Sequence, residues 1–289
     1  MRDNMFEPPF RWNLTNQTHL GGLVRGEKAE TYQGFLNHLL VCCSRTLPFA
    51  GDSDLVFVGR SPESIFDHLS GLLFDTSWFD RLHLLQFSMR WQDEAEIRRR
   101  YPKAIASMRD YLRHLQLDPS ALITRKRPVS FIDLVVSGDT FGRLVNLLHS
   151  WSRESGVDWS AVKRKLRLIG ITERTKSSPK TWRWHLKAEW TTVLQRGSIK
   201  NVSIPRDLWG YLGDYQLKVT ESFTPARWAH PDSARPIYSD QQLKALRLAY
   251  DLFEYGKTPT RRAELAAQLG AEPSMKLRWF RGLVQEIRR

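Results

Sequence analysis

The feature of this chain that most constrains its fold is a repeated succession of short apolar runs and helical patterns. Runs rich in apolar residues are expected to form strands at 55–58, 82–88, 129–136 and 166–171, and apolar residues at helical spacing follow the first three of them. Strands that alternate with helices indicate βαβ units, and an unbroken apolar strand is buried on both faces. We therefore predict an α/β fold with a mostly parallel sheet that carries helices on both faces.

The chain is expected to divide into three parts. Residues 1–171 would form the α/β core, and residues 172–238 an irregular basic loop with a small β appendage, whose strands are expected at 188–194 and 215–222. Residues 239–289 begin with a capping-box serine, Ser239, and then show three short amphipathic patterns. This pattern predicts a small helical C-terminal domain of the helix-turn-helix or winged-helix kind.

Composition narrows the compartment and the partners. The 289 residues include 44 Lys and Arg against 31 Asp and Glu, a net charge of +13 that favours anionic partners. No apolar run approaches the ~18 residues of a membrane span, and the N-terminus has no signal-peptide pattern, so we expect a cytoplasmic protein with no membrane partner. Only two cysteines occur, the adjacent Cys42 and Cys43, which fits a reducing compartment and excludes a cysteine-based metal site. The scattered histidines predict no zinc site.

The stretch 131–148 passes within three residues from an apolar run, through Ser137-Gly138-Asp139-Thr140, to a helical pattern. Ligands of open α/β sheets bind beyond the carboxyl ends of the strands, where a helix N-terminus offers free N–H groups to an anion. Gly138 would let the backbone approach a phosphate, and the hydroxyls of Ser137 and Thr140 would donate hydrogen bonds to it. The alternative is a plain turn in which Asp139 caps the helix.

A second turn of small residues, Gly59-Arg60-Ser61, follows the run 55–58. Ser61 as N-cap and Pro62 in the first turn would start the next helix. If both runs are parallel strands, the two turns lie at the same edge of the sheet and together form a pocket. This second turn favours a binding site over the plain turn.

The segment 131–140 resembles the phosphoribosyl-diphosphate binding motif of the type I phosphoribosyltransferases. In that motif an apolar strand and an acidic pair precede a Thr/Ser-Gly-x-Thr loop that opens a helix. The resemblance covers residues 27–171, about half of the chain. It implies that Asp133 binds ribose hydroxyls at the catalytic centre, and that Gly59, Arg60 and Ser61 face the diphosphate together with Mg²⁺. It also implies that the 5′-phosphate is held by Ser137, Gly138, Asp139 and Thr140.

What the resemblance implies for function is binding of phosphoribosyl diphosphate or of a phosphoribosyl nucleotide, with transfer of the phosphoribosyl group to a base. The sequence departs from the family pattern at Ile132, where the first acid of the pair usually stands, and at Val136, where several members carry a general acid or base. These departures keep a second class open, that of a non-catalytic protein that senses a phosphoribosylated metabolite or binds nucleic acid.

Three further basic or aromatic groups have two interpretations each. Lys276, Arg278 and Arg281 in the C-terminal part would reach DNA phosphates if that part is a helix-turn-helix unit, and otherwise they would serve packing or protein contact. The run 181–185 would stack a base and hold a phosphate, or form an ordinary strand. The arginine-rich runs 98–100 and 125–127 are expected to be solvated helix and loop charges, the alternative being contacts to phosphate.

Overall fold

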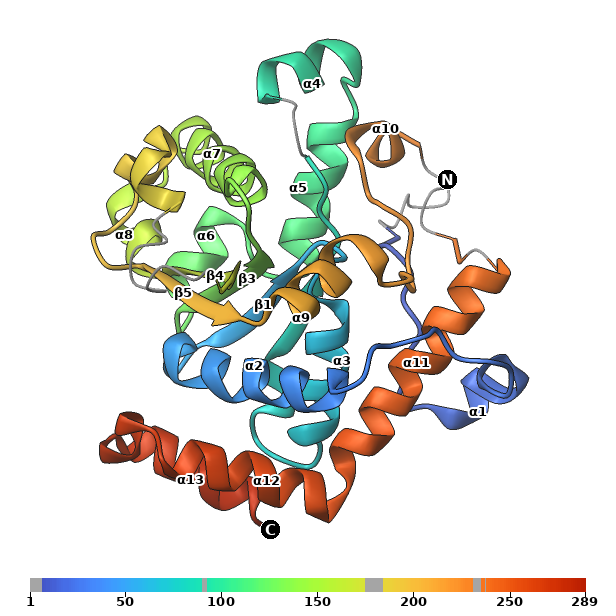
Figure 1. The fold of residues 1–289 in the computed structure, drawn as a ribbon. Helices are drawn as coiled ribbons and strands as arrows, with labels where there is room; N and C mark the ends of the chain where they lie inside the picture. Colours follow the sequence, from blue (N-terminus) through green and yellow to red (C-terminus); the bar gives the residue numbers. More distant parts are fainter. Residues whose placement is uncertain (1–6, 90–92, 175–183, 231–234, 237) are drawn as a thin grey trace.

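The computed structural model describes residues 7–89, 93–174, 184–230, 235–236 and 238–289. This part is an α/β fold with one five-stranded sheet in the order β2-β1-β3-β4-β5, in which every neighbouring pair of strands is parallel (Figure 1). The predicted α/β class and the parallel sheet are thereby confirmed. The strands are β1 (Asp54–Val58), β2 (Leu82–Leu85), β3 (Val129–Leu134), β4 (Leu166–Glu173) and β5 (Ile199–Ile204).

The predicted β appendage is wrong in its two strands. Residues 189–193 form a 3₁₀ turn, η5 (Glu189–Val193), and no strand occurs at 215–222. The strand of this region is instead β5, which pairs with β4 at the edge of the main sheet. On one face of β5, Val202 and Ile204 are buried, whereas Ile199, Asn201 and Ser203 on the other face are only partly buried. An edge strand of this kind lacks the unbroken apolar run by which the others are recognised.

Helices cover both faces of the sheet because alternate residues of each strand point in opposite directions. In β1, Leu55 and Phe57 join a core on one face, and Val56 and Val58 join a second core on the other face. Figure 1 shows the two layers, with the blue and cyan helices on one side and the green ones on the other. The first layer contains α2 (Phe35–Ala50), α3 (Glu63–Leu72) and α9 (Arg206–Gly210), and the second α4 (Glu94–Arg100), α5 (Ala104–His114), α6 (Pro119–Thr124), α7 (Asp139–Glu154) and α8 (Trp159–Arg164).

Short elements complete the chain outside these two layers. Pro102 interrupts the expected long helix and separates α4 from α5. The remaining short elements are α1 (Gln17–Leu20), η1 (Gly21–Val24), η2 (Phe79–Arg81), η4 (Trp184–Lys187), the π-helical η6 (Tyr211–Tyr215), α10 (Pro225–Trp228) and η8 (Pro273–Lys276). Among the described residues, no helix combines the length and the apolarity that crossing a membrane requires.

The C-terminal helices α11 (Asp240–Lys257), α12 (Pro259–Gly270) and α13 (Arg278–Ile287) share their core with the sheet. Their buried residues, among them Leu252, Leu265 and Phe280, belong to the same cluster as the strand residues Leu55 and Phe57. Ser239 caps α11 by accepting from the backbone N–H of Gln242, as expected. A C-terminal domain that stands apart from the core stays a prediction.

Helix α11 crosses α3 at two glycines. A β-carbon on Gly71 would overlap the carbonyl of Phe253, and one on Gly256 would lie 2.7 Å from the carbonyl oxygen of His68 and 2.9 Å from the amide nitrogen of Leu72. The two helix backbones therefore touch without intervening side chains, and no larger residue fits at either position.

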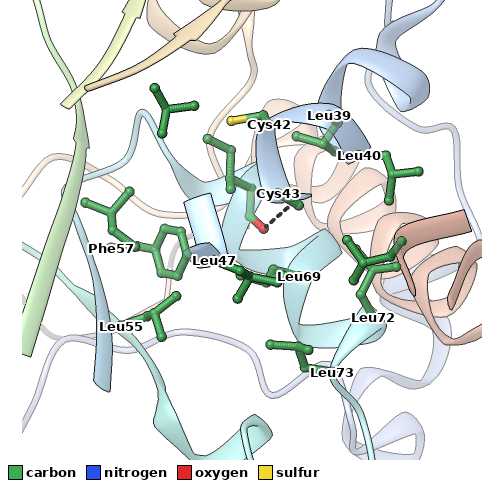
Figure 2. Close-up of a cluster of buried hydrophobic side chains, with 14 of the residues drawn as sticks. Leu39, Leu40, Cys42, Cys43, Leu47, Leu55, Phe57, Leu69, Leu72 and Leu73 are labelled. Carbon is green, nitrogen blue, oxygen red and sulfur yellow. Dashed lines mark hydrogen bonds between the residues drawn. The ribbon is translucent and has the colours of Figure 1, made fainter. Parts of the chain in front are cut away.

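The core between α2, α3 and β1 is apolar and contains both cysteines (Figure 2). Cys42 and Cys43 are buried and form no disulfide, and the thiol of Cys43 lies 4.0 Å from the carbonyl oxygen of Ile65. Burial raises the pKa of Cys42 to about 12 and raises that of Cys43 well above its usual range. A thiol that stays protonated is a poor nucleophile, so these cysteines serve packing.

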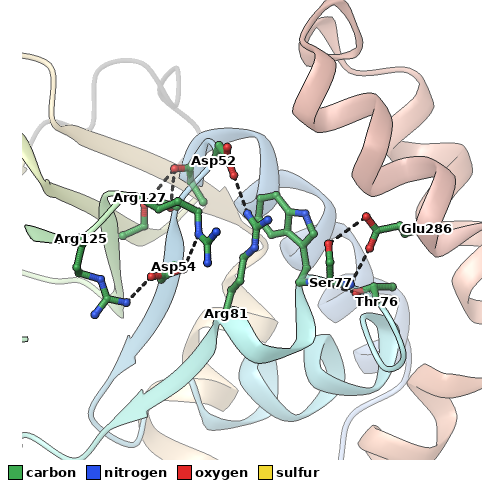
Figure 3. Close-up of polar contacts among 12 residues, drawn as sticks. Asp52, Asp54, Thr76, Ser77, Arg81, Arg125, Arg127 and Glu286 are labelled. Carbon is green, nitrogen blue, oxygen red and sulfur yellow. Dashed lines mark hydrogen bonds and ion pairs between the residues drawn. The ribbon is translucent and has the colours of Figure 1, made fainter. Parts of the chain in front are cut away.

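Ion pairs gather at the amino ends of the strands (Figure 3). Asp54 at the start of β1 pairs with Arg125 and with Arg127, whose Nε lies 3.1 Å from Asp54 Oδ1. Arg125 is therefore largely withdrawn from solvent, so the interpretation of 125–127 as solvated charges is wrong for this residue, whereas Arg127 stays exposed as expected. On α13, the carboxylate of Glu286 accepts from the amide (2.7 Å) and hydroxyl (3.0 Å) of Ser77, which fixes this helix to the loop after α3.

Candidate functional site

The strand order creates a crevice at the carboxyl ends of β1 and β3. After β1 the chain crosses to β2 on one side, and after β2 it returns to β3 on the other side. The loops that leave β1 and β3 thus diverge, and such a switch point is where open parallel sheets bind their ligands. A cavity of about 340 Å³ lies there, and both loops line it.

The loop after β3 forms one wall of this cavity. Asp133, Ser137, Gly138, Asp139 and Thr140 all line it, as the sequence predicts for a single site. Gly138, at φ +83°, is the N-cap of α7, and no side chain caps the first turn, so Asp139 is the first helical residue and the cap expected of it is not formed. The N–H groups of this turn are available to an anion. The hydroxyl of Ser137 donates to Asp139 Oδ2 (2.8 Å), so in this structure it is engaged within its own loop.

Asp133 holds a buried position near the end of β3. Its Oδ1 accepts from the backbone N–H of Leu134 at 2.7 Å, which orients the carboxylate at the rim of the sheet. The two departures from the family pattern flank it. The side chain of Ile132 is buried in the opposite core, whereas Val136 is 55% exposed and lines the cavity. The cavity therefore has one strand carboxylate in place of an acidic pair.

The loop after β1 forms the second wall, with Gly59, Arg60 and Ser61. Gly59 has a φ of +74°, and its amide donates to the carbonyl of Leu85 at 2.8 Å, which ties the loop to the end of β2. The N-cap expected at Ser61 is found one residue later. Helix α3 begins at Glu63, and its N-cap, Pro62, makes no side-chain hydrogen bond to the first turn. Ser61 is therefore free of a capping role.

A third wall comes from residues 209–223, which sequence reasoning did not assign to the site. The chain leaves α9 and passes across the carboxyl ends of the strands toward α10, shown in orange in Figure 1. No binding motif marks these residues, and 215–222 was expected to form a strand of a small β appendage. The cavity-lining residues of this wall are Trp209, Gly213, Asp214, Lys218, Ser222 and Phe223.

Lys218 is the cation of this third wall. Its Nζ donates to the carbonyl of Leu212 at 2.7 Å. The pKa of Lys218 is lowered to about 8, chiefly by burial and in part by the neighbouring Arg60, against the opposing effect of Glu63, Asp133 and Asp214. An anion bound in the cavity would stabilise the charged ammonium of Lys218 and would therefore raise the pKa of this group.

Hydrogen bonds from α3, from the loop after β1 and from the chain after β2 fix the third wall in place. Buried Glu63 accepts from the amide of Val219 (3.2 Å) and from the hydroxyl of Thr220 (2.8 Å). Arg60 Nη1 donates to the carbonyl of Thr220 at 3.3 Å, and the amide of Ser88 donates to the carbonyl of Phe223 at 3.1 Å. The segment that closes the cavity is thus bonded to α3, to the loop after β1 and to the chain that follows β2.

Trp184 packs on the loop 137–140 from outside the cavity. Its indole lies against Gly138 and Gly170, and its Nε1 donates to Asn201 Oδ1 at 2.7 Å. The ring stands 6.0 Å from that of Phe141 on α7 and 6.0 Å from that of Trp190. Of the run 181–185, Trp184 and His185 are described, and 181–183 lie outside the described residues. Trp184 shapes the loop and does not line the cavity.

The charges of the cavity lining are mixed. Arg60 and Lys218 provide two cations, and Asp133, Asp139 and Asp214 provide three carboxylates. Within the described part of the chain, no group of three or more His, Cys, Asp or Glu side chains stands in a metal-binding arrangement. A magnesium ion commonly uses only one or two carboxylates together with substrate phosphates, and this lining can supply those.

The basic residues of the C-terminal part lie elsewhere. Lys276 ends η8, and Arg278 and Arg281 belong to α13; all three are exposed. Arg281 Nη1 donates to the carbonyls of Met275 (3.1 Å) and Lys276 (2.8 Å). None of the three lines the switch-point cavity.

Comparison of the chain with family models, with curated proteins and with solved structures finds no match. The fold and the site define an α/β protein with a switch-point cavity between β1 and β3.

Proposed function

We propose that this protein binds a phosphorylated ribose, as phosphoribosyl diphosphate or as a phosphoribosyl nucleotide, in the cavity between β1 and β3. The observation that carries the proposal is that the loop 59–61, the loop 137–140 and Asp133 line the same cavity. These are the groups to which the type I phosphoribosyltransferase pattern gives the diphosphate, the 5′-phosphate and the ribose hydroxyls. The helix N-terminus at Asp139 favours an anion at the 5′ end.

In the enzymatic form of this proposal, the protein transfers the phosphoribosyl group to a base. A ring nitrogen of the base bonds to the anomeric carbon, the bond from that carbon to the diphosphate oxygen breaks, and diphosphate leaves with the bonding electrons while the base loses its N–H proton to solvent. Asp133 would hold the ribose hydroxyls, and Arg60 would neutralise the diphosphate. Mg²⁺ would supply further neutralisation, held by the ligand's phosphates and by the lining carboxylates.

The alternative is a sensor that binds the same ligand without turnover. Two features favour it: Ile132 is buried where the family carries an acid, and Val136 offers no proton donor or acceptor to the cavity. The remaining carboxylates, Asp139 and Asp214, stand on other elements. A site that keeps its phosphate loops and lacks the acidic pair is suited to binding more than to catalysis.

The sensor alternative also includes nucleic-acid binding through the C-terminal helices. The exposed Lys276, Arg278 and Arg281 favour it, as does a hollow of about 300 Å³ nearby in the sequence, lined in part by Lys257, Arg262, Arg288 and Arg289. A triple K276Q/R278Q/R281Q variant is expected to weaken binding of a labelled DNA duplex and to reduce its salt dependence by about three phosphate contacts. Unchanged binding, or no binding by the wild type, would dismiss this function.

A thermal-shift titration with phosphoribosyl diphosphate, with and without Mg²⁺, tests ligand binding. We expect stabilisation by the ligand, larger with Mg²⁺, followed by release of diphosphate when bases are added if the protein is an enzyme. Stabilisation without release would select the sensor. No stabilisation at millimolar ligand would exclude the proposed function.

Matched aspartate variants show whether the effect arises in this cavity. Asp133→Asn should abolish or greatly reduce stabilisation by the ligand. Asp158→Asn is the control, because Asp158 caps α8 outside the cavity by accepting from the amide of Ser160, and asparagine is an equally good cap. Equal ligand responses of the two variants would show that the assignment of Asp133 is wrong.

A further inference from the structure

Gln86 carries a polar atom that the folded chain does not satisfy. The residue directly follows β2, is 2% exposed and lines the switch-point cavity. Its side-chain Nε2 is buried and has no hydrogen-bond partner among the described residues. A buried donor without a partner costs free energy, and native structures seldom keep one without a use.

The surroundings of Gln86 fix the orientation of its carboxamide. Its backbone amide donates to the hydroxyl of Tyr111 at 3.2 Å, which holds the main chain. Its Oε1 lies 3.3 Å from the hydroxyl of Thr220, whose single proton is shared between this oxygen and Glu63 Oε1 at 2.8 Å. With the oxygen engaged by Thr220, the nitrogen is the group left for a ligand.

The position of Gln86 indicates which part of a ligand it meets. The loop 137–140 follows β3, and Gln86 follows β2, so both lie at the carboxyl edge of the sheet, on opposite sides of the central strand β1. Two strand spacings separate the ends of β2 and β3 by about 10 Å. A ribose whose 5′-phosphate occupies the β3 loop would direct its substituent at the anomeric carbon across β1 toward β2. Arg60 stands on this path, and Lys218 lies close enough to Arg60 to feel its charge.

We infer that Gln86 is a specificity residue that donates a hydrogen bond from Nε2 to an acceptor oxygen on the anomeric substituent, the diphosphate of phosphoribosyl diphosphate. The inference rests on the proposed function and adds to it a preference for ligands that carry an oxygen-rich group at that carbon. Arg60 and Lys218 would attract the same diphosphate through their positive charges, and the neutral carboxamide of Gln86 would orient it through a directional hydrogen bond. A carbonyl oxygen of a nucleotide base could accept the same hydrogen bond. The test therefore distinguishes a diphosphate oxygen from a base carbonyl as the acceptor.

The test measures binding of phosphoribosyl diphosphate, ribose 5-phosphate and inosine 5′-monophosphate by isothermal titration calorimetry. For Gln86→Met we expect roughly a tenfold loss of affinity for phosphoribosyl diphosphate, the size of one hydrogen bond to a charged oxygen. Affinity for ribose 5-phosphate should stay within about twofold on the same scale. Gln86→Glu should lose at least as much for the diphosphate ligand, because a carboxylate offers no donor and repels an anion.

The matched control is Gln216→Met. Gln216 is also buried, at 6% exposure, and also has an unsatisfied side-chain atom, Oε1, but it does not line the cavity. Its replacement should change none of the affinities, and circular dichroism should show all variants folded.

Several outcomes overturn the inference while leaving the proposed function intact. The inference is wrong if wild type binds phosphoribosyl diphosphate and Gln86→Met binds it equally well, or if that variant loses ribose 5-phosphate to the same extent. It is also wrong if Gln86→Glu binds as tightly as wild type, which would make position 86 an acceptor, or if only the inosine nucleotide is lost, which would assign Gln86 to the base. Failure of the wild type to bind all three probes would instead remove the proposed function.

Discussion

The indole of Trp184 occupies the space that any side chain at Gly138 would need. Gly138 also has a φ of +83°, a conformation that L-residues seldom adopt. The loop at the N-terminus of α7 thus owes its shape both to a glycine and to the tryptophan packed on it. A simple exchange of this glycine therefore changes the stability of the protein as well as its proposed ligand contacts.

We predict that Gly138→Ala lowers the free energy of unfolding by about 3 kcal/mol, through backbone strain and overlap with Trp184. Gly197→Ala is the control, because Gly197 has a similar φ of +80° and open space around it. It should lose only about 1 kcal/mol. Urea denaturation measures both, and a double variant that adds Trp184→Leu should cost less than the sum of its single changes. Equal losses at 138 and 197 would show that the contact with Trp184 costs nothing.

Binding of a phosphorylated ligand should weaken as the pH rises through 8. Burial lowers the pKa of Lys218 to about 8, so the ammonium is charged below this pH and loses its proton above it. An anion binds the charged form better, and the second ionisation of a phosphate, near pH 6, is complete throughout this range. Titrations between pH 7 and 10 should show affinity falling up to about tenfold per unit above pH 8.

Lys218→Met should bind more weakly than wild type at pH 7 and should show a flatter pH profile. Lys200→Met is the control, since Lys200 is exposed on β5 and outside the cavity. A wild-type profile that stays level up to pH 10, or one that Lys218→Met leaves unchanged, would contradict this role.

Below pH 6.5 the contact between α3 and α12 should lose stability. His68 Nδ1 lies 3.0 Å from the carbonyl oxygen of Leu252, and its Nε2 accepts from Nε of Arg261, which is 1% exposed, at 3.3 Å. The pKa of His68 is lowered to about 4, chiefly by burial and in part by the arginine, against the opposing effect of the hydrogen bond to Leu252. The unfolded chain therefore binds a proton first. The stabilisation is complete above pH 6.5 and is lost as the pH falls toward 4, by about 3 kcal/mol at most.

Replacement of His68 by glutamine should flatten the dependence of unfolding free energy on pH between 6.5 and 4. Burial raises the pKa of the neighbouring Asp67 to about 6, which gives the opposite dependence, so the comparison is between wild type and His68→Gln at each pH. His19→Gln, at an exposed position, is the control. Parallel curves for wild type and His68→Gln would refute the prediction.

The crossing of α3 and α11 should tolerate no methyl group at Gly256. Alanine favours a helix by about 1 kcal/mol over glycine, but here its β-carbon would press on the backbone of α3, so a net loss of about 1–3 kcal/mol is expected. Gly282→Ala in α13 has open space and should stabilise the protein slightly. Thermal denaturation should give melting temperatures that shift in opposite directions, and a stable Gly256→Ala variant would show that the helices can separate.

The parallel sheet and the two loops of the cavity could be predicted because local sequence carries them. A strand buried on both faces is an unbroken apolar run, as at 129–134, and a glycine turn before a helix has its own signature. Strand β5 escaped prediction since Lys200, Asn201 and Ser203 break its apolar run at the edge of the sheet. The third wall escaped too, because the segment around Lys218 is held by bonds from Thr220 and Val219 to Glu63, some 156 residues earlier in the chain.

Charge patterns misled where a tertiary partner was decisive. Arg125 looked like a solvated loop residue, yet it pairs with Asp54, 71 residues earlier. Arg261 in α12 is buried against His68 and Glu264 rather than displayed to solvent. The periodicity of α11, α12 and α13 indicated amphipathic helices, but an apolar face does not reveal whether it covers a neighbouring helix or the central sheet.

Helix α3 has one end beside the cavity and the other beneath the C-terminal helices. Its first residue, Glu63, bonds the segment that closes the site, and Gly71 near its end touches the backbone of α11. A side chain can change rotamer when its neighbour moves, whereas two backbones in contact have no such freedom. Any ligand that displaces α3 along its axis must therefore displace α11 as well. The orientation of the C-terminal helices would then differ between the empty and the occupied cavity.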